Sequence, residues 1–127
     1  MQLIYRRVRV ILLNATNEAL TVEGAEVLVG AWSAGRTISH GETVARQSAR
    51  TFGTESSTLG RGTEAFVRFA STTGYFQLHW HLPWVGELRC EPVHDDVARR
   101  IIVYTNDDDP ADVAVLITLP PHRDPLR

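Results

Sequence analysis

Short apolar runs rich in β-branched and aromatic residues recur along the chain between clusters of Gly, Asn, Asp, Ser and Thr. No helical period of apolar positions persists for three turns, and this pattern is typical of β-strands joined by turns. We therefore predict an all-β protein. The predicted strands are Leu3–Leu13, Ala19–Val22, Glu26–Trp32, Glu42–Ser48, Thr63–Ala70, Tyr75–His81, Glu87–Pro92, Arg99–Tyr104 and Asp112–Leu119.

Alternation within these strands predicts which side chains face the core. In the strand Thr63–Ala70, the residues Ala65, Val67 and Phe69 share one face, and Phe66, Arg68 and Ala70 share the other. Short strands of this kind in a chain of 127 residues predict a single-domain antiparallel β-sandwich over residues 1–127. We expect 120–127 to be a frayed end.

Polar clusters predict the connections between strands. Asn14–Glu18, Ser71–Gly74 and Asn106–Pro110 carry side chains that favour tight turns, so we predict hairpins there. Asn14 also begins a glycosylation sequon, but the N-terminus lacks the features of a signal peptide, so we interpret Asn14 as a turn residue. The longest irregular stretch, Thr51–Arg61, is expected to be a functional or mobile loop.

Composition excludes several classes of protein. Cys90 is the only cysteine, so an intramolecular disulfide framework and a four-cysteine zinc site are excluded. The net charge is −2 and all 13 basic residues are arginine, which argues against nucleic acid as a partner. No apolar run approaches the roughly 20 residues of a membrane-spanning helix. We expect synthesis in the cytoplasm, so a role at target-cell membranes would require release of a soluble form.

The most informative segment is Phe76–Trp84, where two tryptophans and two histidines crowd the end of a predicted strand. Tryptophan combines a large apolar face with one N–H donor, which suits a membrane interface or a ring-shaped ligand. Most tryptophans belong to a core, but Pro83 should end strand pairing and turn Trp84 outward. We therefore expect at least one of Trp80 and Trp84 to be exposed.

Metal binding is an alternative for two segments. His79 and His81 are two residues apart on a strand and could bind zinc with His94, although such histidines are more often polar surface residues. The acidic run Asp107–Pro110 could bind calcium, although acidic turns are usually only solvated. We predict no metal and no cofactor. Protonation of His79 and His81 near pH 6 could instead increase affinity for anionic membranes.

Three motifs in order resemble those of the aegerolysin family. They are Trp80-His-Leu-Pro-Trp84-Val-Gly86, the preceding Arg61-Gly-Thr-Glu64, and Ala31-Trp32. The resemblance runs from about Val8 to Leu119 and includes the small component of two-component insecticidal crystal toxins. It implies a β-sandwich that binds membrane lipid, commonly sphingolipid with sterol or a ceramide phospholipid, and recruits a larger pore-forming partner. The lipid that we predict is of sphingolipid or anionic type. It implies no catalysis, and the chain has no nucleophile elbow, P-loop or dinucleotide fingerprint, so we predict a protein that is not an enzyme.

The resemblance assigns lipid contacts to Trp32 and Trp84. Arg61 stands where the family has an acidic residue, and His81 and Leu82 replace the Asp and Cys of the family motif. An arginine beside exposed tryptophans can bind a lipid phosphate, so Arg61 is a candidate from its own chemistry. The further candidates for lipid binding are Trp80, His79, His81 and Tyr75.

A soluble lectin-like or protein-interaction module is the second hypothesis for the same residues. The aromatic cluster would then stack on sugar rings or pack on a protein. Carbohydrate recognition needs polar groups around the aromatic rings, and Gln77, His79 and Arg61 could supply them.

Overall fold

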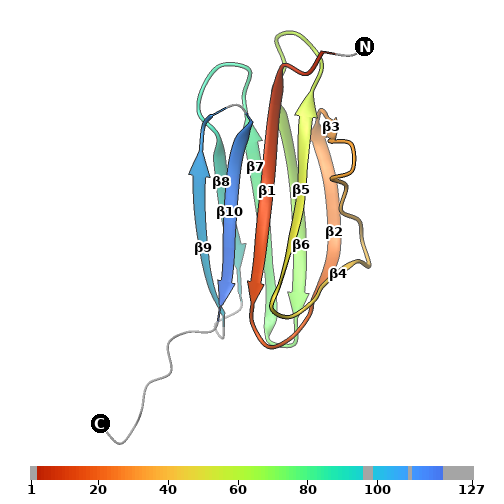
Figure 1. Cartoon of the computed structure of the whole chain (residues 1–127), viewed down its shortest axis with the longest axis vertical. Coiled ribbons are helices and arrows are strands. Elements are labelled where there is room, and N and C mark those ends of the chain that lie inside the picture. Colours follow the sequence, from red (N-terminus) through yellow and green to blue (C-terminus); the bar gives the residue numbers. More distant parts are fainter. Residues whose placement is uncertain (1–2, 96–98, 109, 119–127) are drawn as a thin grey trace, which may run out of the picture.

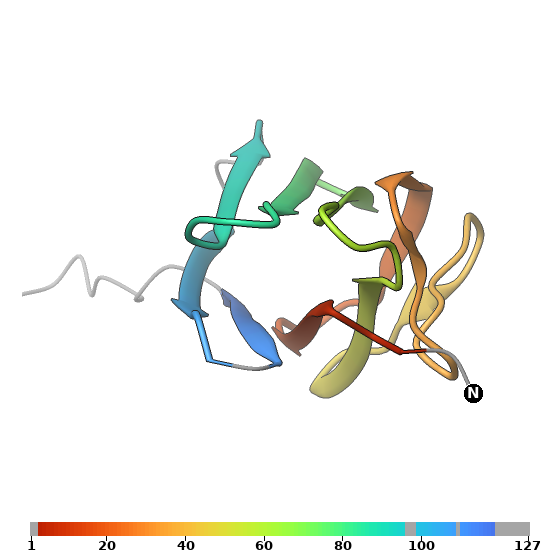
Figure 2. The ribbon, with the colours of Figure 1, turned by 90° about the horizontal axis from the view of Figure 1, so that it is seen from above.

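The chain folds as two five-stranded sheets packed face to face (Figures 1 and 2). The computed structural model describes residues 3–95, 99–108 and 110–118, and these residues contain no helix. It therefore has no helix long and apolar enough to cross a membrane within those ranges. The predicted all-β sandwich is confirmed. Its strands are β1 Arg6–Ala15, β2 Leu20–Val29, β3 Ala31–Trp32, β4 Thr43–Val44, β5 Ser48–Ser56, β6 Thr63–Ser71, β7 Gly74–Leu82, β8 Arg89–His94, β9 Arg100–Asn106 and β10 Ala111–Thr118.

The order of strands is β3-β5-β1-β10-β9 in the first sheet and β4-β2-β6-β7-β8 in the second. Neighbouring strands are antiparallel except β1 and β10, which are parallel. Ser71–Gly74 joins β6 to β7 and Asn106–Pro110 joins β9 to β10, as the predicted hairpins require. Asn14–Glu18 is not a hairpin, because it leads from β1 in the first sheet to β2 in the second.

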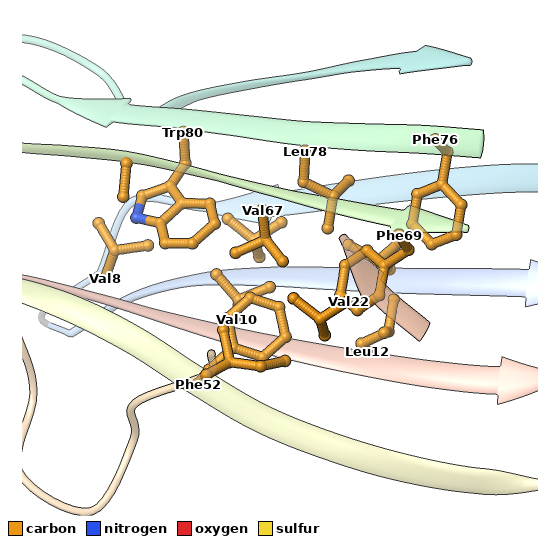
Figure 3. Packing of buried hydrophobic residues seen from close by; sticks show 14 of the residues in the cluster. Val8, Val10, Leu12, Val22, Phe52, Val67, Phe69, Phe76, Leu78 and Trp80 are labelled. Carbon is orange, nitrogen blue, oxygen red and sulfur yellow. The ribbon is translucent and has the colours of Figure 1, made fainter. Parts of the chain in front are cut away.

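The core lies between the two sheets and follows the predicted alternation. Ala65, Val67 and Phe69 of β6 are fully buried, whereas Phe66 and Arg68 are only partly covered. The largest buried side chains include four aromatic rings that pack in series between the sheets (Figure 3). Burial of each such ring stabilises the fold by roughly 2 to 3 kcal/mol. These rings are Phe52, Phe69, Phe76 and Trp80.

Two predicted strands, Ala19–Val22 and Glu26–Trp32, are largely one strand. The predicted strands leave a break around Gly24. In the structure β2 continues through Gly24, and the register between β2 and β6 shifts between Val22 and Gly24. A glycine in a strand often marks a β-bulge, and Gly24 has this role here. The real interruption is Gly30, which separates β2 from β3.

The predicted loop Thr51–Arg61 was wrong over its first half, because β5 extends to Ser56. Its small polar residues resemble a loop, yet Phe52, Thr54 and Ser56 alternate inward and pair with β1. The polar side chains can be buried because they form hydrogen bonds. For example, the Thr63 hydroxyl donates to Thr54 Oγ1 at 2.8 Å. Conversely, most of the predicted strand Glu42–Ser48 is irregular.

The interpretation of Asn14 as a turn residue was wrong, because Asn14 is fully buried in β1, one residue before the strand ends, and pairs with both neighbouring strands. Its amide nitrogen donates to the carbonyl oxygens of Glu18, Val44 and Ala45 at 2.9 to 3.1 Å. Its Oδ1 accepts from the backbone N–H and the hydroxyl of Thr16. The side chain thus joins the first β-connection to the β4 segment and is inaccessible to a glycan. The predicted frayed end 120–127 lies outside the described residues.

Candidate functional site

One end of the sandwich carries most of the predicted functional residues. We call it the loop end: residues 3–5, Gly30, 57–62, 83–88, 107, 108 and 110, which lie at the top of Figure 1. Three of its segments expose large apolar side chains to solvent. The exposed side chains are Leu3, Tyr5, Leu59 at 71% and Val85 at 83% exposure. A domain that displays such side chains on several loops of one end has a surface suited to an apolar partner.

An open cavity of about 510 Å³ lies at the loop end and brings together Trp32 and Arg61. The volume is within the roughly 300 to 1,000 Å³ that is typical of small-molecule sites. Polar residues, including Glu55 and Arg61, form part of its wall. The lining residues are Val29, Gly30, Ala31, Trp32, Ala34, Glu55, Ser56, Ser57, Thr58, Arg61 and Gly62.

Two glycines shape this cavity. Gly30 has a φ of +93°, and a Cβ there would lie 2.4 Å from the Glu55 carbonyl oxygen. A Cβ on Gly62 would lie 2.0 Å from the Leu82 carbonyl oxygen and 2.7 Å from Pro83 Cα. Only glycine permits such a close backbone approach. The loop that carries Arg61 is therefore packed directly against the segment that leads to Trp84.

The prediction that Trp80 binds lipid was wrong, because Trp80 is fully buried and cannot contact a ligand in this structure. It alternates inward on β7 together with Leu78 and Phe76, and Pro83 comes too late to turn it outward. Its Nε1–H donates to Thr54 Oγ1 at 2.9 Å. Trp80 therefore supports the cavity from the side of the core.

Trp84 is partly exposed in the loop between β7 and β8. Its ring meets the ring of Tyr5 edge-on, with 5.7 Å between centroids. Arg6 holds the same loop by donating to the carbonyl oxygens of Pro83 at 3.2 Å and Gly86 at 3.3 Å. The N–H of Leu88 further donates to the Asp107 carboxylate at 2.7 Å. The loop is thus fixed at both ends while the indole remains accessible.

His79 and His81 face outward on the second sheet, around a hollow of about 190 Å³ that Arg89 and Glu91 also line. His79 Nε2 lies within hydrogen-bond distance of Glu64 Oε2, at 2.6 Å. The predicted histidine pair is therefore on the sheet surface and separate from the loop-end cavity.

The zinc alternative fails on geometry. His94 is in register with Phe76, whose side chain faces the core, whereas His79 and His81 face solvent. Over residues 3–95, 99–108 and 110–118, no three of His, Cys, Asp and Glu form a metal-binding group. The calcium alternative includes position 109, which lies outside the described residues.

Tyr75 is not brought together with the other predicted residues, because it lies at the opposite end of β7 from the loop end. At roughly 3.3 Å per residue, the strand separates it from Leu82 by more than about 20 Å. The guanidinium of Arg68 covers its ring, 3.6 Å from Cζ to the centroid. This contact gives Tyr75 a structural role on the sheet surface.

Cys90 packs against the core, and burial raises the pKa of its thiol to about 12. Thiolate is the nucleophilic form, so this environment suppresses reactivity at neutral pH. The geometry supports the interpretation of Cys90 as a small hydrophobic residue.

Solved structures of other proteins share this fold. No protein-family model matches the chain, and no curated protein matches its sequence. The crystal structure of RahU protein in complex with a Tris molecule aligns with a TM-score of 0.71 at 13% identity, over 93% of this chain and 98% of that chain. Nakanori, described as a lipid binding protein, aligns with a TM-score of 0.68 at 15% identity, over 89% of this chain and 71% of that chain. At these identities the likeness establishes the β-sandwich alone.

Sequence patterns missed several residues of the loop end. The pattern places Tyr5 in the predicted strand Leu3–Leu13, and it places Glu55, Ser57 and Thr58 in the predicted loop Thr51–Arg61 without singling out any of the three. Leu59 did carry a signal, because a leucine beside Gly60 in a polar loop has no core to enter.

Proposed function

We propose that the protein binds membrane lipid through its loop end. The observation that carries the proposal is the joint presence of Trp32 and Arg61 in one open cavity, at the same end as four exposed apolar side chains. Indole rings favour the boundary between headgroups and acyl chains. A guanidinium binds phosphate through a planar pair of N–H donors.

The proposed mechanism is adsorption without a chemical step. Leu59 and Val85 would leave water for the acyl region, and this burial contributes about 25 cal/mol for each Å² of apolar surface. Arg61 would bind the headgroup while Trp32 packs beside it in the cavity. The fold shared with a protein described as lipid binding supports this proposal.

Sphingolipid or anionic lipid is the ligand class that we propose, with a larger pore-forming protein as partner. This part of the proposal extends the resemblance to the aegerolysin family and to the small component of two-component toxins. The protein would then be the targeting component and would have no enzymatic activity of its own.

A lectin-like function is the second candidate, and the polar lining of the cavity favours it. Glu55, Ser57 and Thr58 place hydrogen-bonding groups around the Trp32 indole. An aromatic face surrounded by such groups is an arrangement that can hold a sugar ring. Free sugar would occupy this cavity without a bilayer, which separates the two candidates.

Co-sedimentation with liposomes tests the proposal. Vesicles of phosphatidylcholine alone are compared with vesicles that also contain sphingomyelin and sterol, or an anionic lipid. We expect binding to one of the supplemented mixtures and a loss of roughly tenfold or more in Trp32→Ala and Arg61→Gln.

The controls separate lipid contact from misfolding. Leu59→Ser and Val85→Ser change side chains that are mostly in solvent, so they should weaken binding without lowering the midpoint of thermal unfolding. Tyr104→Ala removes an exposed aromatic ring from β9 and should leave binding unchanged. Wild-type protein that sediments with none of the mixtures would refute lipid binding, and release by free sugar would favour the lectin-like candidate.

A further inference from the structure

A second, smaller cavity of about 140 Å³ lies beside the first sheet, where Arg7, Arg9 and Arg36 converge with Ser33 and Pro110. Arg7 and Arg9 alternate outward on β1. Its volume is well below the roughly 300 to 1,000 Å³ of sites that enclose whole small molecules. A cavity of this size suits a single small group rather than a ring.

Two buried polar atoms of this cavity have no hydrogen-bond partner among the described residues. They are the Oγ of Ser33, a residue with only 5% exposure, and Nη1 of Arg36. An unpaired buried donor costs about 1 to 3 kcal/mol, and more when it is charged, so native proteins rarely leave one unused. Both donors belong to residues that line the same cavity.

The backbone holds these two residues in place. Ser33 N–H donates to the Gly53 carbonyl oxygen at 2.9 Å, and Gly53 N–H donates to the Arg36 carbonyl oxygen at 3.0 Å. Arg36 N–H in turn donates to the Ser33 carbonyl oxygen at 2.9 Å. The turn is therefore fixed to β5 before any ligand arrives, which lowers the entropy cost of binding.

The local charge is positive. Asp112 is already held by Arg9 through two bonds, Nε–Oδ1 at 2.8 Å and Nη2–Oδ2 at 3.1 Å, and this pair raises the pKa of Arg9. Glu55 lies across from Arg7 in the strand register, but no ion pair joins them in the described part of the chain. Among the described residues, neither Arg7 nor Arg36 takes part in an ion pair, so their guanidinium groups retain their charge within this part of the chain.

We propose that this cavity binds one tetrahedral oxyanion of the phosphate type. The Arg36 guanidinium and the Ser33 hydroxyl donate to its oxygens, with Arg7 and the fixed Arg9 supplying further positive charge. The anion is either free phosphate or the phosphate of a lipid headgroup. The site is separate from the loop-end cavity, and it does not depend on the function proposed for that cavity.

Titration of the labelled protein with inorganic phosphate, followed by amide chemical shifts in NMR, tests the site. We expect saturable shifts centred on residues 33–36 and 7–9, and equal additions of chloride should not reproduce them. Arg36→Gln and Ser33→Ala should weaken phosphate binding, with roughly a tenfold loss for the arginine. Arg46→Gln removes an exposed arginine from the segment before β5 and serves as the matched control.

A second arm distinguishes the two sources of the anion. Vesicles of phosphatidylcholine are compared with vesicles that also contain phosphatidic acid, whose phosphate is exposed. Vesicle binding that requires Arg36 and is displaced by inorganic phosphate would identify a headgroup site. Binding of inorganic phosphate without Arg36-dependent vesicle binding would identify a free-anion site.

Three results would overturn the proposal. The first is the absence of phosphate-dependent shifts in wild-type protein, which would mean that water, and not an anion, accepts from the two buried donors. The second is an affinity that Arg36→Gln and Ser33→Ala do not change. The third is an equal loss in Arg46→Gln, which would indicate diffuse electrostatic attraction. Val85→Ser should leave phosphate binding unchanged, so failure of lipid binding at the loop end would not be mistaken for failure of this site.

Discussion

The indole of Trp32 meets the indole of Trp80 edge-on, with ring centroids 6.4 Å apart and an angle of 63° between the planes. Trp32 lines the loop-end cavity, whereas Trp80 is fully buried and packs on Phe52 with 5.8 Å between centroids. The wall of the cavity is therefore continuous with the aromatic core. Any change of the buried ring should alter both the stability of the fold and the support of Trp32.

Replacement of Trp80 should be among the most damaging single changes in the core. Trp80→Ala should lower the free energy of unfolding by roughly 3 to 5 kcal/mol, because it leaves a large cavity. Trp80→Phe retains a ring but loses the bond to Thr54, so we expect a loss of about 1 to 3 kcal/mol. Urea unfolding measures both. Val85→Ala should change stability by less than about 0.5 kcal/mol, and a Trp80→Phe protein as stable as wild type would contradict the role of the bond.

Gly62 should be intolerant of even one extra carbon. The atoms that a Cβ would meet are backbone atoms of Leu82 and Pro83, which cannot move aside as a flexible side chain would. Gly62→Ala should therefore destabilise the protein by about 1 to 3 kcal/mol or more and displace the loop that carries Arg61. Gly24→Ala is the matched control, because a Cβ there has no neighbour within 4 Å. Similar unfolding midpoints for the two variants would refute the proposed close approach.

Asn14, near the end of β1, should contribute more to stability than an ordinary polar strand residue. Asn14→Ala removes the donors for three carbonyl oxygens of the β1–β2 and β4 segments. Unsatisfied buried groups cost about 1 to 3 kcal/mol each, so we expect a loss of at least about 2 kcal/mol in chemical unfolding. Asn17→Ala, at an exposed position of the same connection, should be nearly neutral. Equal losses in the two variants would show that the buried amide has no special role.

Periodicity predicted the sheets well where one face of a strand is strongly apolar. β6 is the clearest case, because Ala65, Val67 and Phe69 all enter the core as their alternation indicated. Periodicity failed for β5, whose inward Thr54 and Ser56 are polar. Their burial depends on hydrogen bonds, from Thr63 and Trp80 to Thr54 and between Ser56 and Thr58, which an apolar pattern does not reveal. Periodicity also missed the parallel pairing of β1 with β10, which joins residues about 100 positions apart and has no local signal.

The candidate site was predicted by residue type more than by position. Trp32 and Arg61 were chosen from separate motifs, and the fold places them in one cavity. Trp80 and Tyr75 were assigned to the same group, yet one is in the core and the other at the far end of β7. Strand direction and burial decide these outcomes, and neither can be obtained from the spacing of aromatic residues alone.

The Glu18 carboxylate should make stability depend on pH in the acidic range. The hydroxyl of Thr72 donates to Glu18 Oε2 at 2.7 Å, the Thr72 N–H donates to Oε1 at 3.1 Å, and the buried Arg99 also binds Oε1. The Thr72 hydroxyl bond is the largest of the causes that lower the pKa of Glu18 below its ordinary value of 4.5. These bonds link the β1–β2 connection to the β6–β7 hairpin and to the residue before β9.

A carboxylate with a lowered pKa in the folded state contributes stability above its unfolded pKa and loses it as the pH falls through the folded value. Glu18 should therefore stabilise the fold at neutral pH, and the contribution should decline below about pH 4.5. Thermal unfolding from neutral pH down to about pH 3 measures this decline. Glu18→Gln should lower the midpoint at neutral pH and flatten its fall with acid, whereas Glu26→Gln, at an exposed position of β2, should leave the curve unchanged. If Glu18→Gln and wild type lost stability in parallel across this range, the acid sensitivity would have to arise from other carboxylates.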